Sequence, residues 1–366
     1  MAGAGIITFL HNNNYGSALQ AYALQQTVSE LGVECVHLDY NPDRLEKIRN
    51  LLTSGNSLKL ILDGIRKRSV MADQSGARRK SDAIPAFYRK RMKLSALCRN
   101  GKDLREQSRD LDLLICGSDQ IWNPVWLNPA YFLTFADKET PRIAYAASLG
   151  VSTLPKASKI RKIRRWTKGF RAVSVREQEG AELLEQMTGR KAEVMPDPVC
   201  LLSRDEWNEI AGQAPEGEPY LLCYFIGENA GYWEKVRALQ QETGLRVLVM
   251  PVTAESYRSG YELLDGAGPE EFLAAVRDAA CFCTDSFHGL VFGTIFGTRT
   301  ELFRRYREED PESKNSRVDQ FQRLIREKGM DAFLEYETRK WTCPNCSTPF
   351  SVHHNICMKC RKRLKK

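Results

Sequence analysis

The N-terminal segment alternates two short apolar runs with one helical pattern. Residues 5–10 are apolar and bounded by glycine and polar residues, which predicts a strand. Across residues 17–31 the apolar positions recur at near-helical spacing, and Gly32 ends the pattern, which predicts a helix. Residues 34–38 then predict a second strand. The three elements form a βαβ unit, whose polar loop HNNNYG lies where a ligand loop would be at the carboxyl end of a strand.

The same alternation continues along most of the chain. It predicts parallel sheets covered by helices on both faces, and therefore an α/β fold. Further strands are predicted at 111–116, 142–150, 172–176, 192–198, 220–226, 246–251 and 280–285, and helices at 156–168, 178–187, 232–242, 269–279 and from about residue 288.

Basic charge is concentrated in two segments of this 366-residue chain, whose net charge is +8. Residues 43–110 carry 18 Lys/Arg against 8 Asp/Glu, and residues 339–366 carry eight Lys/Arg and no acidic residue. Such clustering favours an anionic partner, for which a lipid-diphosphate carrier, a membrane surface and nucleic acid are the candidates. The alternative is a solvated helical insertion followed by a solubilising tail.

The composition predicts a cytoplasmic globular protein of two domains. No apolar run approaches the ~20 residues that a membrane helix needs, and the N-terminus lacks the basic region and apolar core of a signal peptide. Eleven cysteines without such a signal indicate a reducing compartment, in which most of them are buried thiols.

The last 26 residues contain two CxxC pairs, Cys343/Cys346 and Cys357/Cys360. Four thiolates at this spacing predict a tetrahedral zinc site, with rubredoxin-like iron as the alternative metal. A site filled by four cysteines is closed and hence structural, so His353 and His354 are expected outside it. Metal binding would supply the folding energy that so short a segment lacks.

Two further segments carry candidate chemistry. In CFCTDSFHGLVFG, an apolar strand brings Asp285 and His288 to a helix N-terminus, where an anion and a proton transfer are both favoured. Arg176 ends the strand AVSVR and can bind phosphate or carboxylate, or it can pair with Glu177 or Glu179. Asp119 and Asp197 are strand-end carboxylates that can cap turns or act as acids or bases.

In order and spacing, these segments resemble the polysaccharide pyruvyl transferase family up to about residue 335. The resemblance is carried by GIITFLHNNNYGSALQAYALQ, DLLICGSDQIWNP, RIAYAASLG, SVREQEG, PDPVCLL, TDSFHGLVF and NSRVDQF. It implies a GT-B-like pair of Rossmann-type doubly wound domains with a cleft between them. The expected parts are an N-terminal acceptor domain at 1–168 with a basic insertion at about 43–110, a C-terminal donor domain at 169–338, and the added zinc ribbon at 339–366.

The resemblance also implies an activity. Family members would transfer an enolpyruvyl-derived group from phosphoenolpyruvate to a sugar of a cell-surface glycan precursor, which forms a pyruvate ketal and releases phosphate. Arg176 matches the family's donor-associated arginine, and His288 matches the histidine of its His-Gly pair. Many members have an arginine two residues before that histidine, where this chain has Ser286, so one donor contact must be lost or supplied elsewhere.

The expected site residues follow from these matches and from the strand ends. Amide side chains suit sugar hydroxyls, and Tyr15 could stack on a sugar face. No catalytic metal is required by this set. We expect catalysis by His288, Asp285 and Asp119, donor binding by Arg176, Ser286 and Gly289, acceptor binding by Asn13, Asn14, Tyr15, Gly16 and Ser118, and structural zinc at Cys343, Cys346, Cys357 and Cys360.

Two other functions stay open at this point. One is a GT-B glycosyltransferase with a nucleotide-sugar donor, and the other is a non-catalytic binding protein with a basic ribbon. A nucleic-acid partner is disfavoured because the ribbon has no aromatic residues beyond Trp341 and Phe350. The expected partners are a sugar or lipid-linked glycan acceptor and, through the basic tail, an acidic protein or the inner face of the membrane. The oligomeric state is not predicted.

Overall fold

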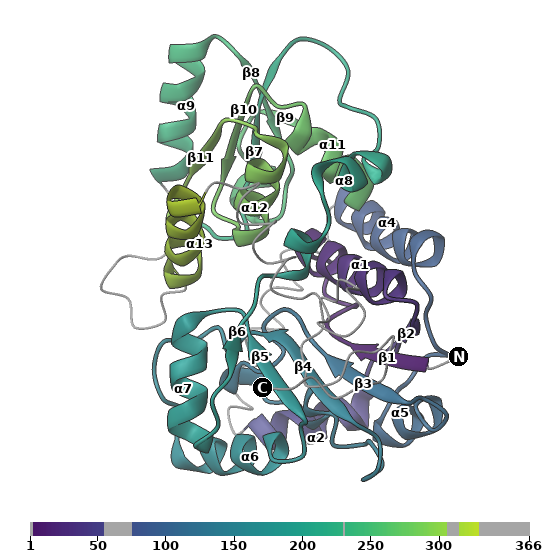
Figure 1. The fold of residues 1–366 in the computed structure, drawn as a ribbon. Helices are drawn as coiled ribbons and strands as arrows, with labels where there is room; N and C mark the ends of the chain where they lie inside the picture. Colours follow the sequence, from purple (N-terminus) through teal and green to yellow (C-terminus); the bar gives the residue numbers. More distant parts are fainter. Residues whose placement is uncertain (1–2, 55–74, 230, 306–314, 329–366) are drawn as a thin grey trace.

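The computed structural model describes residues 3–54, 75–229, 231–305 and 315–328. The zinc-ribbon prediction therefore lies outside the described residues, as does the part of the basic insertion at 55–74. The described chain forms two parallel sheets, one in each half of the molecule (Figure 1). This confirms the predicted α/β class, with a GT-B-like pair of Rossmann-type sheets.

The first sheet has six strands in the order β2-β1-β3-β4-β5-β6. Helices cover both of its faces: α1 packs on one, and α6 and α7 pack on the other. The strands are β1 (Gly3–Ile7), β2 (Glu34–His37), β3 (Leu113–Cys116), β4 (Arg142–Ala147), β5 (Ala172–Val175) and β6 (Glu193–Val194). The helices of this half are α1 (Tyr15–Glu30), α2 (Arg44–Ser54), α4 (Ser75–Arg91), α5 (Gly101–Gln107), α6 (Ala157–Thr167) and α7 (Gln178–Thr188), with 3₁₀ turns η1 (Pro124–Trp126) and η2 (Pro129–Phe132).

The strand pairing differs from the sequence prediction at the boundary between the halves. A boundary at 168/169 assigns β5 and β6 to the second domain, but β5 pairs with β4 and β6 pairs with β5 in the first sheet. The alternation of strands and helices is unbroken across this point, so periodicity alone could not show where one sheet stops. The second sheet begins only at β7.

The second sheet has five strands in the order β11-β10-β7-β8-β9. They are β7 (Tyr220–Tyr224), β8 (Arg246–Val249), β9 (Glu262–Leu263), β10 (Cys281–Thr284) and β11 (Thr300–Leu302). The helices around them are α8 (Arg204–Ile210), α9 (Gly231–Thr243), α10 (Ala254–Tyr257), α11 (Pro269–Arg277), α12 (Phe287–Phe296) and α13 (Asn315–Lys328), with the 3₁₀ turn η3 (Pro198–Leu201).

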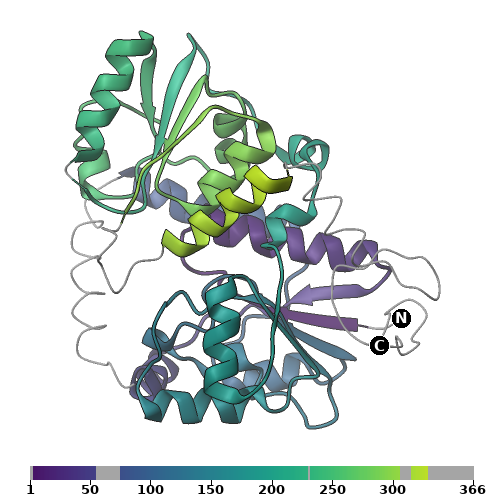
Figure 2. The same cartoon turned by 60° about the vertical axis from the view of Figure 1, so that its left-hand side comes forward.

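Helix α1 lies between the two sheets (Figures 1 and 2). Its side chains are buried on nearly all sides, as expected for a helix that packs against two layers rather than against one sheet and solvent. Leu24 and Val28 contact the first sheet, whereas Ala18 and Tyr22 join the core formed by α8, α11 and α12. The first βα loop therefore lies at the junction of the halves.

The described part of the basic insertion also joins the halves. Lys90 Nζ and Arg91 Nη2 at the end of α4 lie 2.9 and 2.6 Å from the carboxylate oxygens of Glu270 in α11. Phe87 and Tyr88 of α4 are buried in the same core as α11. The described part of this insertion thus connects the two halves through α4 and α11. In the part of the chain that the structure describes, no helix is long and apolar enough to cross a bilayer.

Candidate active site

The first residues of α1 and of α12 meet where the two halves join. A Cβ atom added to Gly16 would lie 2.1 Å from Nδ1 of His288, far closer than any real contact. Only glycine can therefore occupy position 16 while the imidazole lies against α1. This contact explains the glycine of the HNNNYG loop and joins the first βα loop of one half to the predicted histidine of the other.

The other side of the His288 ring contacts Asp197. Nε2 lies 3.2 Å from Oδ2 of Asp197, and Nη1 of Arg176 donates to the same oxygen at 2.5 Å. The Asp197 carboxylate is fully buried. Burial alone would raise the pKa of Asp197, but His288 and Arg176 lower it well below its usual range. An ionised carboxylate only accepts hydrogen bonds, so the proton in the contact with His288 belongs to Nε2.

Arg176 is buried between two carboxylates and an aromatic ring. Its Nε donates to Oε1 of Glu177 at 3.3 Å, and its guanidinium carbon lies 4.8 Å from the ring centre of Phe287. Burial would lower the pKa of Arg176, yet Asp197, Glu177 and Asp119 raise it above its ordinary value. Its Nη2 is buried and has no hydrogen-bond partner among the described residues. A buried charged donor left unpaired is costly, so this nitrogen is suited to an anionic ligand.

Asp119 forms the edge of the site nearest to the first βα loop. Ser17 Oγ donates to Asp119 Oδ2 at 2.5 Å, and Gln120 N donates to Oδ1 at 2.7 Å. Asn12 Nδ2 in turn donates to Ser17 Oγ. The polar loop therefore positions a carboxylate at the carboxyl end of β3, beside the Arg176 cluster.

The structure brings together four residues that the sequence analysis singled out. Gly16, Asp119, Arg176 and His288 converge from four separate strand-to-helix junctions, the first and last of which are more than 270 residues apart in sequence. Residues that the sequence prediction did not place in the site complete it: Ser17, Ser148, Glu177 and Asp197. Ser148 Oγ, for example, donates to Glu177 Oε1 at 2.6 Å.

The structure contradicts the role predicted for Asp285. Its carboxylate accepts from the backbone N–H groups of Ile226 and Gly227 at 2.7 and 2.8 Å and from Arg305 Nε at 2.9 Å. Tyr232 Oη also donates to Oδ2 of this carboxylate, at 3.4 Å. The side chain is fully buried by these donors. Asp285 therefore connects β7 to β10 and is not free to act as an acid or base.

Tyr15 is also wrong as a sugar-stacking residue. Its ring is 2% exposed and stacks on Phe272 of α11 with ring centres 4.9 Å apart. Its hydroxyl donates to the carbonyl oxygen of Ala267 at 2.7 Å. Burial raises the pKa of this phenol further above its usual value. Tyr15 packs α1 against the second half, and a sugar could not reach it.

Four other predicted site residues have structural roles in this chain. Ser118 is fully buried and donates to the carbonyl oxygen of Ala146, which excludes a direct acceptor contact. Ser286 Oγ accepts from Gly289 N and so caps α12, while Gly289 leaves room for Thr284 Oγ1. Asn14 caps α1 by accepting from Ser17 N. Asn13, exposed and in the left-handed region at φ 49°, remains available to an acceptor.

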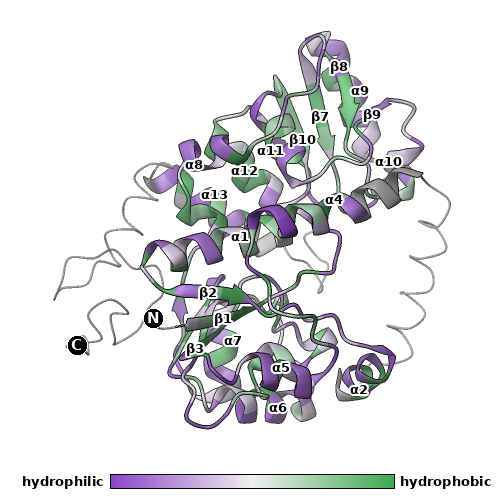
Figure 3. Cartoon of the chain, turned by 90° about the vertical axis from the view of Figure 1, so that its right-hand side faces the viewer, coloured by the Kyte–Doolittle hydropathy of each residue, from purple (hydrophilic) through white to green (hydrophobic). Residues whose placement is uncertain are grey.

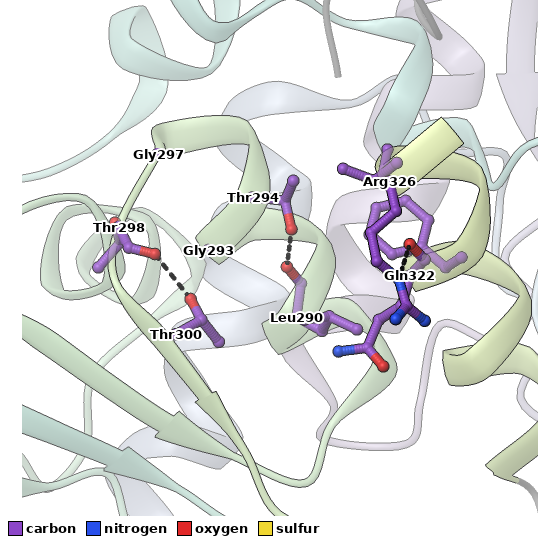
Figure 4. A pocket seen from close by; sticks show the side chains of 10 residues that line it. Leu290, Gly293, Thr294, Gly297, Thr298, Thr300, Gln322 and Arg326 are labelled. Carbon is purple, nitrogen blue, oxygen red and sulfur yellow. Dashed lines mark hydrogen bonds between the residues drawn. The ribbon is translucent and has the colours of Figure 1, made fainter. Parts of the chain in front are cut away.

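A separate cavity of about 430 Å³ lies between α12 and α13 (Figure 4). The hydroxyls of Thr294, Thr298 and Thr300 donate to backbone carbonyls, and Arg326 Nε donates to the carbonyl oxygen of Gln322. None of the residues around Arg176 lines it. These three hydroxyls and Arg326 Nε are thus satisfied locally, and the cluster around Arg176 lies elsewhere, at the junction of the halves.

The family described as polysaccharide pyruvyl transferase matches residues 14–300. No curated protein matches the chain.

Solved structures share its arrangement at low sequence identity. The UDP-GlcNAc 2-epimerase of Neisseria meningitidis has a TM-score of 0.48 and 9% identity, and the two matched regions cover 91% of this chain and 94% of that one. MnaA of S. aureus has a TM-score of 0.48 and 10% identity over 97% of this chain and 100% of that one. The glycosyltransferase SnogD of Streptomyces nogalater has a TM-score of 0.39 and 12% identity over 91% and 93%. At these scores the likenesses carry no inference about activity.

Proposed function

The chain belongs to the polysaccharide pyruvyl transferase family, and we propose that it transfers a pyruvyl group from phosphoenolpyruvate to a sugar of a cell-surface glycan precursor. The product would be a pyruvate ketal, with phosphate released. The observation that supports the proposal is the buried hydrogen-bonded chain Arg176–Asp197–His288, which would provide a guanidinium for an anion and an oriented imidazole in one place.

The donor must be held by its negative charges. Phosphoenolpyruvate carries a carboxylate and a phosphate, and the unpaired Nη2 of Arg176 is suited to either. Asp197 and Glu177 hold the other guanidinium nitrogens, so Nη2 is fixed in direction. Ser286 stands where many members of the family have an arginine, and its hydroxyl caps α12, so it does not replace that donor contact.

The reaction requires a proton donor and a base. His288 would protonate the methylene carbon of the enol, which leaves an oxocarbenium-like centre at the neighbouring carbon. One sugar hydroxyl attacks that carbon, and a second displaces phosphate to close the ketal. Asp197 contacts Nε2 and would hold the imidazole in position, while Asp119 would accept a hydroxyl proton.

The acceptor side is proposed at the first βα loop. Asn12 and Asn13 are exposed, and their amides suit sugar hydroxyls. A sugar bound there would lie beside Gly16, and hence beside Nδ1 of His288.

A donor screen tests this function. The full chain is incubated with a pool of glycan precursors and either phosphoenolpyruvate or nucleotide sugars, and products are detected by mass spectrometry. Acceptor-dependent mass gain with phosphoenolpyruvate alone is expected. Mass gain only with a nucleotide sugar would assign a glycosyltransferase, and no gain with any donor would favour a binding protein.

We also propose that residues 339–366 form a zinc-binding, basic tail. Cys343, Cys346, Cys357 and Cys360 would bind one structural zinc ion. The eight Lys/Arg of residues 339–366 would offset the negative charge of a four-thiolate site and give the tail an affinity for an anionic partner.

A further inference from the structure

Helix α2 exposes a stripe of large aliphatic side chains. Leu45, Ile48 and Leu52 are 69%, 47% and 69% exposed. Their spacing of three and four residues places them on one face of the helix. Single exposed apolar residues are ordinary on protein surfaces, whereas an aligned set marks an interaction surface.

A basic helix lies directly beside this stripe. Lys162 Nζ of α6 donates to the carbonyl oxygen of Thr53 in α2 at 2.8 Å. The segment 156–171, which contains α6, has eight Lys/Arg and no acidic residue. Its inner face packs on the first sheet through Ile163. Six basic residues of this segment are exposed: Lys156, Arg161, Arg164, Arg165, Lys168 and Arg171.

Two more exposed apolar side chains border the same region. Trp126, 37% exposed, belongs to η1, which packs against α2. Leu154, 48% exposed, precedes α6. Both helices lie at the end of the first half that is farthest from the second sheet (Figures 1 and 3). We name this set of α2, α6, Trp126 and Leu154 the α2–α6 surface.

We propose that the α2–α6 surface binds an anionic phospholipid bilayer. Aliphatic side chains on an exposed helix insert at the boundary between headgroups and acyl chains, and neighbouring Lys/Arg attract acidic headgroups. Nucleic acid would use the basic residues but leave the aliphatic stripe in water, because bases stack on aromatic rings. A bilayer is the partner that can contact both the aliphatic stripe and the basic residues of this surface.

This contact would fix the orientation of the protein. Helix α12, which carries His288, lies on the far side of α1 from α2 and α6 (Figure 1). The first half would face the lipid, and the junction of the halves would stay clear of it. The inference rests on exposure and charge at α2 and α6 and not on the chemistry proposed for Arg176 and His288.

Vesicle co-sedimentation of the full chain tests the proposal. The lipid is phosphatidylcholine alone or mixed with phosphatidylglycerol. One variant, L45S/I48S/L52S, removes the aliphatic stripe, and another, R161E/R165E, reverses two exposed charges of α6. The matched controls are L97S, at an exposed leucine outside the stripe, and R237E/R258E, which makes the same charge change on the second half.

The proposal predicts binding to the mixed vesicles only. Each test variant should lower the partition coefficient at least about tenfold with an unchanged melting temperature. The controls should stay within about twofold, and salt at about 0.5 M should weaken binding of the unmodified chain. Equal binding by the test variants would overturn the proposal and assign lipid binding to the basic tail. Equal binding to uncharged vesicles, or no vesicle binding, would also overturn it.

Discussion

Gly16 and His288 lie against each other across the junction of the two halves, and no side chain larger than hydrogen fits between them. A glycine in the first βα loop thus fixes the position of an imidazole more than 270 residues later. The geometry of the proposed site therefore depends on how the two sheets are joined through α1.

Gly16→Ala should displace the His288 ring and lower the rate of transfer. The new Cβ would lie within 2.3 Å of two ring atoms, so the ring must move. A shift of about 1 Å in a catalytic group can cost about 100-fold, and we expect a loss of kcat/KM of that order. Steady-state kinetics checks it, with Gly101→Ala as the control because nothing lies within 4 Å of a Cβ at that glycine. If Gly16→Ala keeps wild-type kinetics, transfer does not depend on the position of the His288 ring against Gly16.

Asp197→Asn should destabilise the fold strongly. It leaves the buried Arg176 guanidinium without its main counter-charge, and breaking such a buried pair costs about 3–5 kcal/mol. Chemical denaturation measures the loss. Asp278→Asn, which breaks the exposed Arg277–Asp278 pair, should change stability by less than about 0.5 kcal/mol.

The Asp197 carboxylate should also make the free energy of unfolding depend on pH. Because His288 and Arg176 outweigh burial and lower the pKa of Asp197, the ionised form is favoured in the folded state. Its contribution is complete above the unfolded value of about 4 and is lost as the pH falls below it. The difference in unfolding free energy between the wild type and Asp197→Asn should therefore shrink below that pH. A difference that stays constant with pH would contradict the ionised assignment.

His37 should make the fold less stable under mildly acidic conditions. Burial lowers its pKa to about 4, and only the hydrogen bond to the carbonyl oxygen of Ala21 opposes this. In the unfolded chain His37 takes up a proton at about pH 6.5, whereas in the folded chain it stays neutral at that pH. Stability should fall by up to about 3 kcal/mol between about pH 6.5 and 4. His37→Gln removes the titrating group, so equal pH slopes for the two proteins would rule out this origin.

The C-terminal cysteines should bind one zinc ion per chain. Metal analysis of the purified protein checks this, and iron or the absence of stoichiometric zinc would refute it. Truncation after Arg339 should leave turnover of a soluble acceptor almost unchanged, because a closed four-cysteine site is structural. Loss of that turnover would assign the ribbon to the catalytic body.

Much of the fold could be predicted from the sequence because its strands and helices have distinct periodicities. Arg176 and His288 could be singled out for the same reason, since each lies near the point where a strand is followed by a helix. Partners across the junction were not predictable. Asp285 is only three residues from His288 in sequence, but its carboxylate binds backbone N–H groups just after β7. Asp197, 91 residues away, contacts the imidazole instead.

Tyr15 is another residue whose surroundings could not be predicted from the local sequence. Its place in a polar loop suggests exposure, but α1 is covered by the second half, and the ring enters a core that includes Phe272 and Tyr224. Local pattern shows which residues end a strand. Which of them face each other depends on long-range packing between sheets.

The most direct test of the proposed function is transfer from phosphoenolpyruvate in D₂O, with the product analysed by NMR. If His288 protonates the methylene carbon, the ketal methyl group should carry one deuterium, and phosphate should be released in equal amount. His288→Ala should slow this transfer by at least about 100-fold. A product that retains the enol double bond, transfer that occurs only from a nucleotide sugar, or a wild-type rate in His288→Ala would contradict the proposed mechanism.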